Sequence, residues 1–173
     1  MGGIFLGDEL EDPGMSLAAS AGRDGGRDGL SPSVVLLVDD DADIRMLTRT
    51  FLEHEGYSVF SSGDAERAVQ IFRSVERIDL LVTDLYMPGR SGLELARELK
   101  ALRKDLPVLM ISGGMLEEEQ ETKLKAEGWS FLAKPFQLPE FLAAVHRILG
   151  SVEARRWRES RRGVGLEGLL GER

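Results

Sequence analysis

Five short apolar runs alternate along this chain with longer segments whose apolar residues recur at helical spacing. Strict alternation of this kind is typical of βαβ units, which build a parallel sheet with helices on its faces. The expected strands lie at about 34–38, 57–61, 80–83, 107–111 and 129–132, and the expected helices at about 42–55, 64–74, 92–102, 116–126 and 138–150. The chain is therefore predicted to be an α/β protein.

The residues within these runs refine the prediction. The runs at 34–38 and 108–111 are apolar throughout, as expected for central strands covered on both faces, whereas the run at 57–61 is more polar and suits an edge. Gly56, Gly128 and Gly150 each follow a helical stretch, where glycine favours the end of a helix.

Composition separates the two ends from the middle. Residues 1–32 are rich in Gly, Asp, Ser and Ala without a hydrophobic period, and we expect a disordered N-terminal extension there. Residues 33–150 form the predicted domain. Residues 151–173 form a basic tail around Trp157, for which an extension of the last helix is one interpretation.

Charge and residue content exclude several protein classes. The net charge of −8 argues against a protein that binds nucleic acid by broad electrostatic attraction, although a local basic patch in the tail remains an alternative. The chain contains no Cys and no apolar run of the ~20 residues that a membrane span requires. A cytoplasmic protein without a membrane partner is the expectation.

Charged residues follow three of the predicted strands. Asp39, Asp40 and Asp41 follow the first strand, Asp84 the third and Lys134 the fifth. In an open parallel sheet these positions lie at the carboxyl edge, where such folds bind ligands. Carboxylates that gather at one site repel one another unless a cation intervenes, and Mg²⁺ is the hard, oxygen-binding ion that fits best.

Four motifs in order carry a family resemblance. They are Val-Leu-Leu-Val-Asp-Asp-Asp-Ala-Asp-Ile-Arg at 35–45, Leu-Leu-Val-Thr-Asp-Leu-Tyr-Met-Pro-Gly-Arg-Ser-Gly-Leu-Glu-Leu at 80–95, Pro-Val-Leu-Met-Ile-Ser-Gly-Gly at 107–114 and Phe-Leu-Ala-Lys-Pro-Phe at 131–136. Over about residues 33–150 the chain resembles the receiver domain of two-component response regulators. The resemblance implies a doubly wound (βα)5 flavodoxin-like fold with a five-stranded parallel sheet in the order 2-1-3-4-5.

The resemblance also implies roles for the acidic residues. Asp84 would accept a phosphoryl group, Asp40 and Asp84 would bind Mg²⁺, the backbone carbonyl of Tyr86 would supply a third oxygen, and Asp39 would act through a water. A turn or helix-capping aspartate is the alternative for Asp84. The neighbouring Asp41 and Asp43 are expected to be the cap and first-turn acid of the following helix.

Three further residues complete the implied site. Lys134 would neutralise phosphoryl oxygens and would be joined to Pro135 by a cis peptide. Ser112 would donate its hydroxyl to the phosphoryl group, with a turn serine as the alternative. Phe131 would be the switch residue that responds to Ser112, with a buried core residue as the alternative; it lacks the phenolic hydroxyl of a tyrosine.

The implied function is a phosphorylation-controlled switch rather than an enzyme. A sensor histidine kinase or histidine phosphotransfer protein would supply the phosphoryl group, because His54 and His146 are read as surface or helix-end residues. The receiver is expected to stand alone and to act on an unidentified effector, or as a homodimer through the fourth helix, fifth strand and fifth helix. The alternatives are a Mg²⁺-dependent phosphohydrolase and nucleic-acid binding through the basic tail.

Overall fold

The structure is a computed structural model that describes residues 32–114 and 117–162, with side chains described up to Val152 apart from Gln120. Nearly all of the segment expected to be disordered, 1–32, lies outside the described residues. So do the side chains of the basic tail and residues 163–173, so the nucleic-acid alternative stays a prediction.

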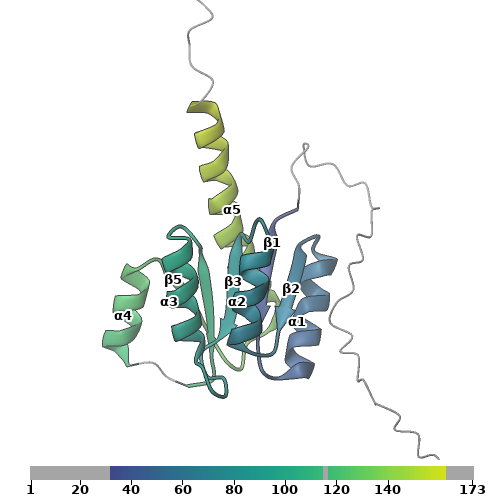
Figure 1. Cartoon of the computed structure of the whole chain (residues 1–173), viewed down its shortest axis with the longest axis vertical. Helices are drawn as coiled ribbons and strands as arrows, with labels where there is room; N and C mark the ends of the chain where they lie inside the picture. Colours follow the sequence, from purple (N-terminus) through teal and green to yellow (C-terminus); the bar gives the residue numbers. More distant parts are fainter. Residues whose placement is uncertain (1–31, 115–116, 163–173) are drawn as a thin grey trace, which may run out of the picture. The chain divides into compact units, whose positions relative to one another are not determined.

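Five parallel strands form one sheet in the order β2-β1-β3-β4-β5, as predicted (Figure 1). Internal positions for β1 and β4 and an edge position for β2 are confirmed. β1 has the expected bounds and each other strand differs from the expected bounds by one residue at one or both ends. Asp84 is the last residue of β3 rather than the first of the loop. The strands are β1 Val34–Val38, β2 Ser58–Ser62, β3 Leu80–Asp84, β4 Val108–Ser112 and β5 Trp129–Ala133.

Five helices cover the two faces of the sheet. Alternate residues of each strand point to opposite faces, so Leu36 packs with α2, α3 and α4, whereas Val35 and Leu37 pack with α1 and α5. Two buried cores, one on each face, result. The helices are α1 Ala42–His54, α2 Ala65–Ser74, α3 Gly92–Leu102, α4 Glu118–Ala126 and α5 Leu138–Arg162.

Local signals explain most helix ends. Asp41 caps α1 by accepting hydrogen bonds from the backbone N–H groups of Asp43 and Ile44, as expected. Gly56 and Gly128 have φ angles of 88° and 81°, the left-handed conformation that ends a helix.

The expected helix end at Gly150 was wrong, and the interpretation that the basic tail extends the last helix is confirmed as far as Arg162, where α5 ends (Figure 1). A glycine within a helix costs only about 1 kcal/mol relative to alanine, and no proline follows to stop the helix. No helix in the described ranges is long and apolar enough to cross a membrane.

Strand register brings the charged residues to one edge. Val38 pairs with Thr83, so Asp39 and Asp84 follow at the same level on neighbouring strands. On the other side of β3, Ser112 pairs with Ala133, which directly precedes Lys134. The carboxyl edge of β1, β3, β4 and β5 therefore carries the candidate site.

Candidate functional site

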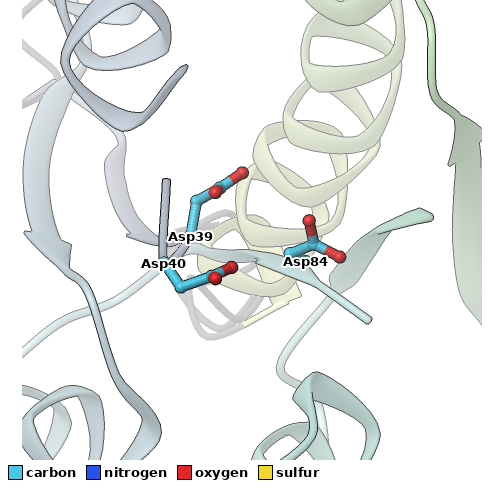
Figure 2. Close-up of side chains that lie close together, drawn as sticks. All are labelled: Asp39, Asp40 and Asp84. Atoms are coloured by element: carbon cyan, nitrogen blue, oxygen red, sulfur yellow. The ribbon is translucent and has the colours of Figure 1, made fainter. Parts of the chain in front are cut away.

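Three carboxylates converge at the carboxyl edge of β1 and β3. One oxygen from each of Asp39, Asp40 and Asp84 lies within 4.8 Å of the others (Figure 2). Asp39 and Asp84 are buried, and Asp40 is exposed. The site is thus a small acidic cluster with buried carboxylates on one side and a solvent-facing carboxylate on the other.

Lys134 connects this cluster to β5. Its ammonium donates hydrogen bonds to Asp84 and, over 3.2 Å, to Asp39. The backbone N–H of Lys134 donates to the carbonyl of Ser112 at 2.7 Å, which fixes the start of the side chain. The Lys134–Pro135 peptide is cis, as expected. The second oxygen of Asp84 accepts the backbone N–H of Tyr86 at 2.9 Å.

Burial and charge act on these groups in opposite directions. Burial raises the pKa of the Asp39 carboxyl above its ordinary value, although the Asp41 N–H and the Lys134 ammonium oppose the shift. Burial alone would lower the pKa of Lys134, but the hydrogen bond to Asp84 and the charges of Asp39 and Asp84 together raise it. Lys134 is therefore held in its charged form.

The donor atoms fit a hard divalent cation. All three side chains offer carboxylate oxygens, the ligands that Mg²⁺ prefers, and no softer nitrogen or sulfur ligand joins the cluster among the described residues. Mg²⁺ keeps several waters in its shell, so a partial set of protein oxygens is sufficient. Asp39, Asp40 and Asp84 are the side chains that would hold it.

The remaining predicted residues lie around the cluster. The Ser112 hydroxyl donates to the carbonyl of Gly114 at 2.7 Å and accepts its N–H at 3.2 Å, the arrangement of a turn serine. Phe131 is half-buried against the core beneath α4. Tyr86 is 60% exposed and its ring lies against Gly114.

The loop after Asp84 is tightly held. Gly92 begins α3, and a Cβ atom there would stand 1.9 Å from the carbonyl oxygen of Asp84. Ser91 and Glu94 form a reciprocal capping box, which the sequence analysis did not anticipate although Ser-x-x-Glu is its signature. These contacts fix the backbone that presents Asp84.

The sequence analysis assigned no role to two charged residues that contact the two ends of β1, Asp79 at its start and Arg45 just after its end. Asp79, at the opposite edge of the sheet, is 1% exposed and accepts the N–H of Val34 at 2.8 Å and a guanidinium hydrogen bond from Arg77 at 2.9 Å. Arg45 on α1 donates to the backbone carbonyl of Asp39 at 2.5 Å. A signal existed for Arg45, since a cation near the N-terminus of a helix opposes the helix dipole.

Comparisons with known proteins agree with this geometry. The sequence model of the response regulator receiver domain matches residues 35–146. Response regulator MprA of Mycolicibacterium vanbaalenii is 36% identical over 118 residues, which cover 68% of this chain and 51% of that protein. The chain spans about half the length of the curated relatives it matches.

Solved structures show the same fold. Chemotaxis protein CheY4 of Vibrio cholerae aligns with a TM-score of 0.63 and 29% identity, covering 68% of this chain and 99% of that chain. Response regulator protein TrrA from Thermotoga maritima, in complex with Mg²⁺-BeF, aligns with a TM-score of 0.59 and 30% identity over 68% and 99% of the two chains. On its motifs, strand order and family match, the chain belongs to the response regulator receiver domain family of two-component systems.

Proposed function

We propose that this receiver is a phosphorylation-controlled switch in which Asp84 accepts the phosphoryl group. The observation that carries the proposal is the contact of Lys134 with Asp84 and Asp39 beside a cluster of three carboxylates. Residues 33–150 form the receiver, flanked by the N-terminal extension and the basic tail. That the receiver acts on its own, without an attached output domain, stays a prediction from the sequence.

The proposed transfer is a displacement at phosphorus. A carboxylate oxygen of Asp84 forms a bond to phosphorus while the bond from phosphorus to the donor's histidine nitrogen breaks, and that nitrogen keeps the electron pair. Hydrolysis later breaks the new oxygen–phosphorus bond, which releases inorganic phosphate and restores the carboxylate. The protein takes part in its own modification and is regenerated, so we regard it as a switch rather than an enzyme with a separate substrate.

The surrounding residues position and neutralise charge in this scheme. Lys134 pairs with a phosphoryl oxygen in place of the Asp84 oxygen that it now contacts, and the Ser112 hydroxyl turns from Gly114 to donate to another. Bound Mg²⁺ would supply further positive charge beside the phosphoryl oxygens. Asp39, Asp40, Asp84 and the Tyr86 carbonyl are its proposed ligands. The Mg²⁺-BeF complex of the relative TrrA supports the choice of Mg²⁺ as the ion.

We further propose that the donor is a sensor histidine kinase or a histidine phosphotransfer protein. His54 is exposed at the end of α1, and His146 lies on α5 beside Glu55, so neither belongs to the cluster. Rearrangement of Ser112 would alter the packing of Phe131 and change the surface of α4, β5 and α5. An effector, or a second copy of the chain, would read this surface.

Labelling with a small acyl phosphate tests the proposal. In the presence of Mg²⁺, we expect the intact mass to increase by one phosphoryl group and peptide mapping to place it on Asp84. Asp84→Asn should abolish labelling, whereas Asp105→Asn, which makes the same change at an exposed position, should not. Equal labelling of wild type and Asp84→Asn would overturn the proposal.

The phosphohydrolase alternative makes a different prediction. Repeated turnover of small phosphate esters, without a phosphoryl group that persists on Asp84, would favour it. The sequence Asp84-Leu85-Tyr86 lacks the second acid that such enzymes usually carry two residues after the nucleophile.

A further inference from the structure

Arg45 occupies a position that its charge does not favour. It lies in the fourth position of α1, which begins at Ala42, and the positive end of the helix dipole disfavours a cation there. Acidic side chains surround it in sequence at Asp40, Asp41 and Asp43. In the described part of the chain it nevertheless makes no ion pair, and its guanidinium donates to the backbone carbonyl of Asp39 at 2.5 Å.

This hydrogen bond completes the set of partners around Asp39. The backbone N–H of Asp39 donates to the carbonyl of Ser62 at 3.2 Å, and its carboxylate accepts from the Asp41 N–H at 2.9 Å and from Lys134. Because Asp39 is only 2% exposed, its carbonyl needs a partner within the protein. Arg45 supplies that partner and so restrains the backbone between Asp39 and Asp40.

Gly63, in the loop between β2 and α2, makes room for the guanidinium. A Cβ atom at Gly63 would lie 3.1 Å from Nη1 of Arg45, and the three atoms nearest to it would all belong to the Arg45 guanidinium. Gly63 does not have a positive φ, so its backbone conformation does not itself require glycine. The guanidinium of Arg45 thus donates to the loop after β1 and lies against Gly63 in the loop after β2.

We propose that Arg45 is a positioning residue for the divalent cation, because it holds the Asp39–Asp40 backbone in the conformation that presents both carboxylates to the ion. The inference rests on the proposed function, which includes Mg²⁺ binding. The direction in which Mg²⁺ affinity changes when Arg45 is removed distinguishes this role from a simple charge effect. Removal of a positive charge near a cation site should strengthen cation binding, whereas loss of a positioning contact should weaken it.

Calorimetric titration with Mg²⁺ as the only ligand measures the direction of this change in affinity. We expect Arg45→Met to weaken Mg²⁺ binding by about 10- to 100-fold, the range found when contacts behind metal ligands are removed. Arg49→Met is the matched control, since it removes the same charge one turn further along α1, where Arg49 pairs with Glu53 at 2.8 Å. Binding by Arg49→Met should stay close to that of wild type.

Gly63→Ala provides a test that leaves Arg45 in place. Its methyl group would stand 3.1 Å from Nη1 of Arg45, so the guanidinium must shift by a few tenths of an ångström. We expect a weakening of Mg²⁺ binding smaller than that for Arg45→Met, and no further loss when the change is added to Arg45→Met, because both changes act on the same contact. Metal-free thermal unfolding of each variant establishes that it is folded. If Arg45→Met does not fold, Gly63→Ala decides the question.

The outcomes distinguish the two proposals. Failure of wild type to bind Mg²⁺ would overturn both the metal part of the proposed function and the role of Arg45. Binding by wild type together with equal or tighter binding by Arg45→Met, or unchanged binding by Gly63→Ala, would overturn the role of Arg45 alone.

Discussion

The ammonium of Lys134 donates a hydrogen bond to the carboxylate of Asp84, across 50 residues of sequence and from two strands away in the sheet. The same ammonium reaches Asp39, the first residue after β1. A single cation therefore contacts carboxylates from two neighbouring strands. This arrangement makes Lys134 a stabilising residue in the absence of metal and a competitor for any metal that binds there.

Lys134→Met should destabilise the metal-free protein by about 2 kcal/mol, because it leaves two buried carboxylates without their cation while partial solvent access moderates the cost. Mg²⁺ should recover part of this loss, since the ion replaces the missing charge and meets no competing ammonium. Urea unfolding with and without Mg²⁺ measures both effects.

Lys123→Met is the control for Lys134→Met, because Lys123 pairs with Glu119 on the exposed face of α4. Its stability should change by less than about 0.5 kcal/mol with or without Mg²⁺. An equal loss for Lys134→Met in both buffers would show that the lysine does not share its site with the metal.

Gly92→Ala should destabilise the protein by about 3 kcal/mol, because the new methyl group would stand 1.9 Å from the Asp84 carbonyl oxygen and 2.8 Å from the Thr83 hydroxyl. The identical change at Gly150 should stabilise it by about 0.5–1 kcal/mol, since Gly150 lies within α5 and a Cβ atom there meets nothing within 4 Å. Chemical unfolding of the two variants should give opposite changes in the free energy of unfolding; changes of the same sign would contradict the prediction.

The sequence predicted the strand order and the convergence of Asp39, Asp40 and Asp84 because strand ends and family motifs are local features. It left the end of α5 open between Gly150 and the basic tail, because a glycine stops a helix only when the following residues favour an end, and those after Gly150 do not. Nor could it identify Asp79. Asp79 directly precedes β3 and Asp84 ends it, and only the three-dimensional contacts show which one is held by Val34 and Arg77 and which one faces Lys134.

Asp79→Ala should therefore lower the stability of the fold and leave phosphoryl transfer to Asp84 unchanged. It removes the acceptor of the Val34 N–H and of Arg77, and we expect a loss of about 3 kcal/mol. Phosphoryl labelling of the fraction that remains folded should match that of wild type, because Asp79 lies at the opposite edge of the sheet. Labelling normalised to the folded fraction, measured well below the unfolding temperature, checks this; loss of labelling in fully folded protein would contradict it.

The capping box at the start of α3 should make part of the stability depend on pH. The Ser91 hydroxyl and backbone N–H both donate to the Glu94 carboxylate, at 2.7 and 3.0 Å, and these hydrogen bonds lower the pKa of Glu94. A carboxylate whose pKa is lower in the folded state contributes stability that is fully present above its unfolded value of 4.5. That contribution is lost as the pH falls through the folded value. Glu94→Ala should thus be less stable than wild type near neutral pH, and the difference should shrink in acid.

Glu66→Ala isolates the capping box from the general effect of an acid near a helix N-terminus, because Glu66 lies in the first turn of α2, which is capped by Asp64 alone. Urea unfolding of wild type and both variants at neutral pH and below pH 4.5 completes the test. The stability difference for Glu94→Ala should fall more steeply with acid than that for Glu66→Ala, since only Glu94 accepts hydrogen bonds from its N-cap residue. Parallel changes in the two variants would mean that the helix dipole, rather than the Ser91–Glu94 hydrogen bonds, accounts for the pH dependence.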